Sequence, residues 1–501
     1  MRILIGISTG LLCLASTLAF AKSPTHCYVS GETSGSKPSH AYGSKQNPYG
    51  SLGEVQADPD CVVINVLYSE TPLDGGIVLK DGQELVGIKG KKGKKGKKGK
   101  KDALPVITNS TTALGGAGII LAKDSKVKHI HVRDTYSSGI LGFPDVNANI
   151  GGKLVLQGVH VTGANQSQQF NPLTNSTSPS ILLGFQEATD LTIKNSNVGE
   201  ADTPSIVVAQ LDGHGKIRIS NTRVYDQGHV PDGGSEYSAG ISLNGLGESS
   251  VDIEVLNTSV SNIGHEVVSN SDGLLMIHQG NGSMTAKVDG YRYSNPEGRG
   301  AQRSSTGIEM GCIYGTGCRF SGTVTDSVIT DAFLAGIQVI DFYGAVPGTD
   351  NTVIVDIRDN EISGSRAGIY LGADNLNGTR QWNVVNNIIS DPVLYGMLIL
   401  AFESNLAEVY IEGNTVQNAG DSGLVFVGNS AGITQFDAGL GGLGSEGNNR
   451  IINSAVNDIV AEGVPVSAAN NWWGSEAGPT SVLEIFGGTV DVDPFLESDP
   501  Q

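Results

Sequence analysis

The sequence predicts an all-β chain that folds as one right-handed parallel β-helix, a solenoid of about twelve coils. Three observations lead to this fold class. A Gly-apolar-x-apolar unit recurs, a second row of Asn, Asp or Gly residues lies between these units, and the composition favours strands. Glycine is abundant, with 69 residues, whereas aromatic residues make up only 6%. This balance suits short strands joined by tight turns.

The first row is a glycine followed by an apolar residue, any residue and a second apolar residue. Alternation of this kind turns every second side chain of a strand toward one face. One coil cannot bury such a row alone, so coils must stack on one another. The units begin at Gly118, Gly139, Gly240, Gly273, Gly307, Gly336, Gly368, Gly396, Gly423 and Gly463, with Ser180 and Ser205 replacing glycine in two more.

The second row places Asn, Asp or Gly three residues before an apolar residue. These residue types tolerate the left-handed backbone that a sharp corner requires. The two rows interleave with a period of about 25 to 40 residues, which is typical of a solenoid. Examples are Asn195/Val198, Asn221/Val224, Asn257/Val260, Asp326/Ile329, Asp359/Ile362, Asn386/Ile389 and Asn453/Val456.

A propeller and a β-sandwich are the alternative folds. A propeller blade needs four antiparallel strands joined by hairpins. The repeats show two clear strand signals and no regular Asn-Gly or Asp-Gly hairpin turns. The solenoid is therefore the better interpretation.

The first 21 residues read as a secretory signal peptide. Arg2 gives the positive start, an apolar stretch follows, and residues 19–21 form a small-residue cleavage pattern. We expect no transmembrane segment in the mature chain, which should be secreted or surface-associated, with the periplasm as a further possibility. The expected organisation is 1–21 signal peptide, 22–89 N-terminal cap and first coil, 90–101 disordered lysine/glycine loop, 102–469 β-helix, and 470–501 C-terminal cap and tail.

Four cysteines remain after this segment, an even number in an oxidising environment. We pair Cys27 with Cys61, and Cys312 with Cys318. Metal binding by these thiols is the less favoured alternative.

The formal net charge of −19 keeps a secreted chain soluble and argues against nucleic acid as its general partner. One segment departs from this balance, because residues 89–101 hold nine lysines separated by glycines. Such a segment should be disordered. It could bind anionic polymers, or it could be a repeat tolerated in a loop. The candidate anion-binding residues are Lys91, Lys92, Lys94, Lys95, Lys97 and Lys98.

The chain resembles the right-handed β-helix repeat proteins of the pectin-lyase-like superfamily, of the secreted bacterial type. The glycine units carry this resemblance over residues 115–470. Residues 79–87 with 105–107 resemble a first coil, and residues 470–479 with 490–495 resemble an end segment. The resemblance implies the fold but little about chemistry, because this fold carries many functions. Within the end segment, Trp472 and Trp473 are expected to cap the last coil, with sugar stacking as the alternative.

Polysaccharide enzymes on this scaffold keep charged residues on the outer face of adjacent strands. We therefore followed the outward residue of each glycine unit, and only the middle coils are polar there. The resulting ligand-binding candidates are Glu309, Gln338, Asp341 and Tyr370, of which Glu309 and Asp341 are weak catalytic candidates. The full outward row is Ile120, Leu141, Leu182, Val207, Ser242, Leu275, Glu309, Gln338, Tyr370, Leu398, Val425 and Pro465.

Two fragments resemble polygalacturonase motifs, namely residues 213–215 and residues 270–272, which end in Asp272. Their order is reversed and the paired aspartates of that family are missing, so we interpret both as coincidence. His129 and His131 would share one face of a strand. No third ligand accompanies them, so we predict no metal site. No cofactor is expected; calcium is possible but unsupported.

Two functions remain open. The first is a secreted, adhesin-like protein that binds polysaccharide or a cell-surface glycan without strong catalysis. It depends on the neutral outer row and on the lack of an acidic pair, because Glu309 has Gln338 beside it. The second is a polysaccharide lyase or glycoside hydrolase acting on an acidic polysaccharide near these residues.

Overall fold

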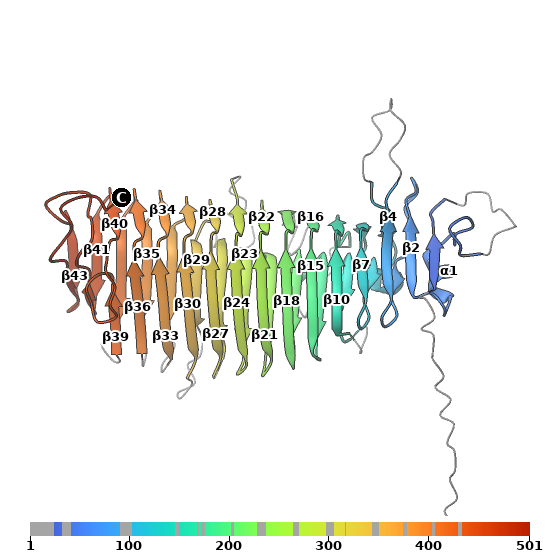
Figure 1. Ribbon diagram of the computed structural model, residues 1–501, viewed down its shortest axis with the longest axis horizontal. Helices are drawn as coiled ribbons and strands as arrows, with labels where there is room; N and C mark the ends of the chain where they lie inside the picture. Colours follow the sequence, from blue (N-terminus) through green and yellow to red (C-terminus); the bar gives the residue numbers. More distant parts are fainter. Residues whose placement is uncertain are drawn as a thin grey trace, which may run out of the picture.

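Equivalent strands of successive coils lie side by side in three long parallel sheets (Figure 1). The sheets hold 16, 12 and 14 strands, so the number of coils is close to the number predicted. The computed structural model describes residues 25–32, 42–90, 103–145, 150–167, 170–171, 176–201, 205–227, 237–263, 270–296, 305–315, 317–342, 350–373, 378–402, 406–428 and 433–500.

The 16-stranded sheet consists of β1 (His26–Val29), β2 (Val63–Leu67), β4 (Glu84–Ile88), β7 (Lys126–Lys128), β10 (Gly152–Gln157), β15 (Thr189–Lys194), β18 (His214–Ser220), β21 (Ser250–Leu256), β24 (Ser283–Asp289), β27 (Arg319–Thr325), β30 (Thr352–Arg358), β33 (Thr379–Val385), β36 (Leu406–Glu412), β39 (Ile433–Asp437), β42 (Pro465–Ser467) and β44 (Thr489–Asp491).

The 12-stranded sheet consists of β5 (Val106–Asn109), β8 (His131–Thr135), β11 (His160–Thr162), β16 (Asn197–Ala201), β19 (Arg223–Gln227), β22 (Ser259–Ser261), β25 (Arg292–Ser294), β28 (Val328–Thr330), β31 (Glu361–Ser363), β34 (Ile388–Ser390), β37 (Thr415–Gln417) and β40 (Arg450–Ile452).

The 14-stranded sheet consists of β3 (Ile77–Val78), β6 (Ile119–Ile120), β9 (Ile140–Gly142), β14 (Ile181–Phe185), β17 (Ile206–Gln210), β20 (Tyr237–Leu246), β23 (Asn270–Gln279), β26 (Thr306–Ile313), β29 (Ala335–Phe342), β32 (Ala367–Ala373), β35 (Tyr395–Ala401), β38 (Ser422–Gly428), β41 (Asn457–Glu462) and β43 (Val482–Ile485). Outside the three sheets are helix α1 (Leu52–Ala57), the 3-10 helix η1 (Ala113–Gly116) and the antiparallel pair β12 (Phe170–Asn171) and β13 (Ser176–Thr177).

Each coil runs through the three sheets in one order. The chain passes from β21 to β22 to β23, and β24 then pairs with β21 in parallel to begin the next coil. The burial pattern of β24 alternates between buried and more exposed residues along the strand. Stacked coils therefore enclose one continuous apolar core, as the alternation in the sequence predicts. This is the parallel β-helix that the superfamily resemblance implies.

Except at Gly463, which has a left-handed backbone and precedes β42, the glycine of each repeat unit lies against a side chain of the 12-stranded sheet. A Cβ added at Gly336 would lie 2.3 Å from Cγ2 of Ile362, and one added at Gly368 would lie 2.4 Å from Cγ2 of Ile389. Neither glycine has a left-handed backbone. Glycine is required here because the two sheets leave no room for a side chain, rather than because of a turn.

Replacing Gly336 with alanine is expected to lower the free energy of unfolding by about 1–3 kcal/mol, because the added methyl group must displace Ile362 and the Gly368 carbonyl. Gly53→Ala is the matched control. Gly53 lies in helix α1 with no atom within 4 Å of an added Cβ, so this variant should be neutral or slightly more stable. Urea unfolding of both variants checks the prediction, and equal unfolding midpoints would contradict it.

The predicted corners adopt the left-handed backbone. Asn195, Asn257 and Asp359 have φ values of 52°, 47° and 58°. One predicted pair is wrong, because Asn453 belongs to a different corner, after β40, and Val456 is 57% exposed. The equivalent pair is Asn448, with φ of 57°, and the fully buried Ile451.

In each coil, the residue after the corner points into the β-helix. In the C-terminal coils this residue is an asparagine, and the asparagines of successive coils form a buried column. Each side-chain Nδ2 donates to Oδ1 of the next asparagine at 2.9–3.0 Å. Each Oδ1 also accepts the backbone N–H of the preceding coil's asparagine. The column therefore satisfies the polar groups of each corner without water. Its members are Asn360, Asn387, Asn414, Asn449 and Asn471.

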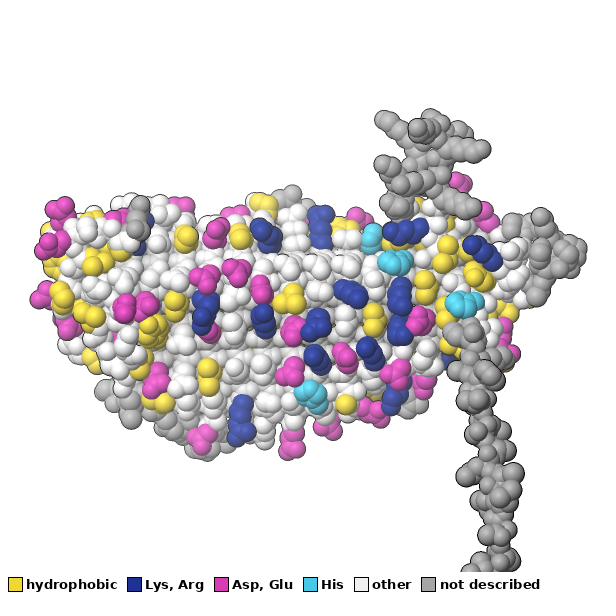
Figure 2. Space-filling view, in the orientation of Figure 1, with side chains coloured by type: hydrophobic (Ala, Val, Ile, Leu, Met, Phe, Trp, Pro, Cys, Tyr) yellow, Lys and Arg dark blue, Asp and Glu magenta, His cyan; other side chains and the backbone are white. Residues whose placement is uncertain are grey.

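The outer face of the 16-stranded sheet carries charges of alternating sign (Figure 2). In register across four strands lie Lys153, Asp190, Lys216 and Asp252. Opposite charges on neighbouring strands attract, whereas like charges would repel. The alternation of sign on this face therefore places opposite charges beside one another on adjacent strands.

At the C-terminal end, β43 and β44 extend two of the sheets, and the end segment closes the core. Trp473 is buried in the core, Trp472 is half-buried, and Phe495 packs against the same core. This agrees with the capping interpretation of the tryptophan pair. In the described part of the chain, no helix is long and apolar enough to cross a membrane.

Candidate functional site

The outer row of the 14-stranded sheet is formed as predicted across the middle coils. Glu309 of β26 pairs in register with Gln338 of β29, which pairs with Tyr370 of β32. The row is wrong only at its end, because Pro465 lies in β42 of the 16-stranded sheet. Val460 is the residue in register with Val425.

Polarity rather than exposure distinguishes the middle coils of this row, because Leu141 and Leu398 are half-buried as well. Glu309 and Tyr370 are half-buried, whereas Leu275, on the coil before Glu309, is buried. Gln338 is buried, and its Oε1 accepts a hydrogen bond from the Thr306 hydroxyl at 3.2 Å. This bond fixes the amide so that its Nε2 group remains available as a donor.

Asp341 does not lie on the outer surface, contrary to the prediction. The predicted strand ended after four residues, but β29 runs through Phe342, and continued alternation turns Asp341 inward. The carboxylate is fully buried and forms an ion pair with the equally buried Arg380 of β33, with Oδ2 and a terminal guanidinium nitrogen 2.5 Å apart. Asp341 therefore stabilises the interior and is not brought together with Glu309 on the outer row.

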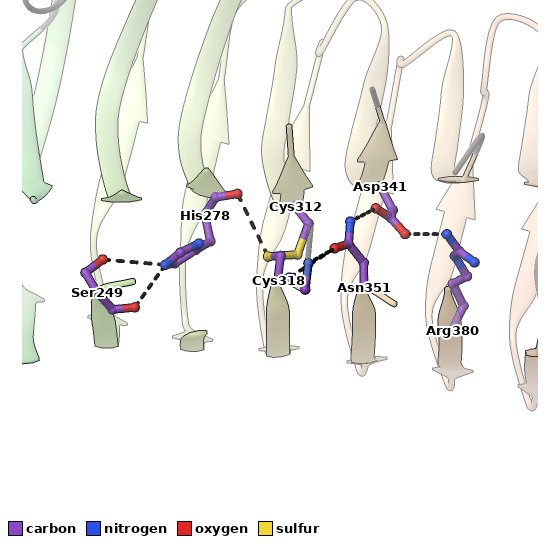
Figure 3. Close-up of a disulfide and its surroundings, with 8 residues drawn as sticks. Ser249, His278, Cys312, Cys318, Asp341, Asn351 and Arg380 are labelled. Atoms are coloured by element: carbon purple, nitrogen blue, oxygen red, sulfur yellow. Dashed lines mark hydrogen bonds and ion pairs between the residues drawn. A yellow bond between two sulfur atoms is a disulfide. The ribbon is translucent and has the colours of Figure 1, made fainter. Parts of the chain in front are cut away.

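Asp341 belongs to a buried polar column that crosses five coils (Figure 3). Asn351 donates from Nδ2 to Asp341 at 2.8 Å, while its Oδ1 accepts the backbone N–H of Cys318 at 3.0 Å. Cys312 is in register with Asp341 on one side and with His278 on the other. The imidazole of His278 lies 3.0 Å from the Ser249 carbonyl oxygen. Burial lowers the pKa of His278, so this ring stays neutral.

The structure places a buried acidic residue beside the outer row, three positions before Leu275, that the sequence interpretation missed. Asp272 lies near the start of β23, on the coil before Glu309. The two residues after it both face the core: a Cβ on Gly273 would lie 2.5 Å from the ring of the buried Tyr293, and Leu274 is fully buried. Two consecutive inward residues leave Asp272 and Leu275 facing outward on either side of them.

Asp272 and Glu309 interact electrostatically. Burial raises the pKa of the Glu309 carboxyl well above its usual range, and the negative charge of Asp272 raises it further. Two neighbouring carboxyl groups in a poorly hydrated site cannot both ionise easily. Burial and the charge of Asp272 therefore both favour the protonated form of Glu309.

Asp272 was missed for two reasons. Strict alternation predicts one outward residue in each glycine unit, which on this coil is Leu275. Gly273 and Leu274 break the alternation because both face the core, so Asp272 also faces outward, three positions before Leu275. The Asp272 fragment was also set aside as coincidence. The signal that could have identified it was an acidic residue immediately before the glycine of a unit next to Glu309.

Both predicted cysteine pairs are disulfides. Cys27–Cys61 joins the N-terminal strands with 5.6 Å between Cα atoms, and Cys312–Cys318 spans the turn from β26 to β27 with 6.1 Å. Among the described residues, the one close group of three metal-type ligands is Cys27, Asp58 and Cys61. The disulfide occupies both thiols of that group, so it does not form a metal site.

The histidine pair considered for zinc is not formed. His129 lies in the corner between β7 and β8, with φ of 56°, and does not share a strand face with His131. His131 instead lies beside His160, with ring centroids 5.9 Å apart. Burial, with a contribution from His160, lowers the pKa of His131 to about 4. The candidate lysines between Lys91 and Lys98 lie outside the described residues.

No family model and no curated protein sequence matches the chain. Two crystal structures of DFA-IIIase from Arthrobacter chlorophenolicus A6 are similar in structure. The complex with GF2 has 11% sequence identity and a TM-score of 0.24, covering 74% of this chain and 88% of that chain. The form without its lid has 12% identity and a TM-score of 0.22, covering 74% and 87%. Such loose alignments do not assign a function.

Proposed function

We propose that this protein binds a carbohydrate on the outer row of the 14-stranded sheet and hydrolyses a glycosidic bond there. The observation that carries the proposal is the pair of Asp272 and Glu309, in which burial and the charge of Asp272 raise the pKa of the Glu309 carboxyl well above its usual range. Glycosidases characteristically use one protonated and one ionised carboxyl group. This pair supports catalysis over the binding-only interpretation, which depended on the lack of an acidic pair.

In this proposal, Glu309 is the general acid. It donates its proton to the glycosidic oxygen as the bond from that oxygen to the anomeric carbon breaks. Asp272, as the carboxylate, stabilises the positive charge that develops on the sugar and assists the attack of water. A water hydroxyl completes the new anomeric group, and the remaining water proton restores Glu309.

The same pair argues against a lyase. A lyase abstracts a proton from the sugar ring, which requires a base. A carboxyl group whose pKa is raised favours the acid form, so Glu309 suits hydrolysis better than elimination.

Gln338 and Tyr370 would extend the binding surface along the rod. Adjacent strands lie about 4.8 Å apart, close to the length of one sugar unit, so a chain parallel to the rod would meet one coil per sugar. The amide of Gln338 offers a hydrogen-bond donor, and the ring of Tyr370 offers an apolar face with a polar end.

Glu309→Gln is expected to lower kcat by about 10²–10⁴-fold, because the amide keeps the shape of the side chain but cannot donate the proton. Activity of the unmodified protein should fall as pH rises through the raised pKa of Glu309, since only the protonated form is active. Reducing-end release from neutral and uronic polysaccharides measures both effects. Glu361→Gln, on the exposed face of β31, is the matched control and should retain full activity.

Carbohydrate binding without cleavage, the adhesin-like alternative, is the second candidate. The near-complete burial of Asp272, which is 2% exposed, favours it because a sugar must reach that carboxylate for catalysis. Retention of a polysaccharide on immobilised protein, with no reducing ends released and no effect of Glu309→Gln, would support binding alone.

We also propose that the protein acts outside the cytoplasm. The predicted signal peptide and the two disulfides support this location. Contact between the lysine-rich segment and anionic polymers stays a separate proposal, which rests on charge alone.

A further inference from the structure

The last three strands of the 16-stranded sheet, β39, β42 and β44, line a groove at the C-terminal end of the rod (Figure 1). The volume of the groove is about 540 Å³, within the range of about 300–1,000 Å³ that is usual for small-molecule sites. Two outward rows of side chains form its floor. One row is Gln435, Pro465 and Thr489, and the other is Asp437, Ser467 and Asp491.

The wall of the groove is a loop that is fixed in advance. Residues 438–449 connect β39 to β40, and Gly442 of this connection lines the groove. The Asp437 carboxylate is 1% exposed and accepts four backbone N–H groups of the connection at 2.9–3.2 Å. Hydrogen bonds to a charged group are stronger than neutral ones, so the wall needs no ligand to hold its shape. The four donors are Gly439, Gly441, Leu443 and Ser445.

The Asp491 carboxylate has a different environment from that of Asp437. It is exposed, and its Oδ1 accepts the backbone N–H of Asp493 at 3.4 Å, which is a long hydrogen bond. Its neighbour in register is Ser467, whereas Asp190, earlier in the same sheet, lies beside Lys153. Pairing between adjacent strands therefore does not account for the charge of Asp491.

The lining groups match the chemistry of a neutral sugar. The Asp491 carboxylate can accept two neighbouring hydroxyl groups, while the Gln435 amide and the Thr489 hydroxyl can each donate and accept. The exposed ring of Pro465 lies between these two strands and offers an apolar surface to the C–H face of a sugar ring.

Other ligand classes suit the groove less well. A divalent cation requires several charged or carbonyl oxygens, and the loop already uses both carboxylate oxygens of Asp437. An anionic sugar would be repelled by Asp491, because like charges at close range oppose each other.

We propose that this groove is a second carbohydrate site, which binds one or two neutral sugar units without cleaving them. The groove belongs to the 16-stranded sheet, whereas Asp272 and Glu309 belong to the 14-stranded sheet. The inference is therefore independent of the proposed hydrolysis and would hold for a protein that only binds carbohydrate.

Saturation-transfer NMR of the full-length protein with neutral disaccharides tests the proposal. The probes are maltose, cellobiose, sucrose, lactose, xylobiose and mannobiose, with digalacturonate as the anionic probe. We expect transfer to at least one neutral disaccharide and none to digalacturonate. Asp491→Asn should weaken this binding about tenfold, as for the loss of a hydrogen bond to a charged group. Glu497→Gln removes an equal charge from an exposed residue outside the groove and should leave binding unchanged.

Gly442→Leu tests where the sugar binds. The nearest atom to an added Cβ is Gln435 Oε1 at 3.4 Å, and Gly442 has no left-handed backbone, so a leucine fits and fills part of the groove. We expect this variant to lose the binding and keep its circular dichroism spectrum. The proposal fails if no neutral disaccharide binds, if binding survives Gly442→Leu, or if Glu497→Gln weakens binding as much as Asp491→Asn. Binding that is lost in Glu309→Gln but kept in Gly442→Leu would place the sugar on the 14-stranded sheet and overturn the proposal as well.

Discussion

Replacing Arg380 with methionine is expected to destabilise the central coils by about 3–5 kcal/mol, the usual cost of leaving one buried charge without its partner. Arg380 and Asp341 are both fully buried, and they form an ion pair with each other. Methionine fills much of the space but removes the guanidinium group that pairs with the buried Asp341 carboxylate. Hydrogen exchange of the β29 and β33 amides measures the loss.

The double variant Asp341→Asn with Arg380→Met is the control for this prediction. The asparagine keeps an acceptor for Nδ2 of Asn351 and removes the unpaired charge. It should recover most of the stability lost in Arg380→Met, since a neutral replacement of a buried ion pair is often tolerated. Equal destabilisation of the single and double variants would show that packing, and not charge, is responsible.

Asn414→Leu is expected to cost about 3–5 kcal/mol, because several buried polar groups lose their partners at about 1–3 kcal/mol each. The Asn414 side chain donates to the carbonyls of Val384 and Glu412 and to Asn449, and it accepts from the backbone and side chain of Asn387. Leucine has a similar volume but makes none of these bonds. Thermal unfolding followed by circular dichroism measures the effect.

Asn418→Gly is the matched control for the asparagine column. Asn418 lies four residues further on, is exposed, and has a left-handed backbone with φ of 58°, which glycine adopts freely. We expect a change of less than about 1 kcal/mol, as for most exposed substitutions. Similar losses in Asn414→Leu and Asn418→Gly would mean that the column contributes little.

The pairing of the outer row followed from the sequence because each glycine unit fixes the register of its strand. A shift of one residue would turn the apolar side chains outward, so Glu309, Gln338 and Tyr370 could only lie side by side. The corners followed for a similar reason, since only a few residue types tolerate a left-handed backbone.

The sequence could not give the length of each strand or the choice between similar corners. Asp341 was placed outside because β29 was expected to end too early. Asn453 and Asn448 both precede an apolar residue by three positions, and only the path of the chain through residues 438–447 decides which one turns the corner into the 12-stranded sheet.

By itself, the sequence determined the stacking of coils and their register, because the local periodicity of apolar residues fixes these features. It suggested the two cysteine pairs without fixing their connectivity, which the structure gives. The tertiary structure alone decided which polar residues meet. Asp272 faces outward because the close approach of two sheets forces two neighbouring residues of one strand inward, and Tyr293 reaches its place behind Gly273 from another sheet of the adjoining coil. Contacts between sheets depend on how the coil closes in space, which no repeat within a single strand encodes.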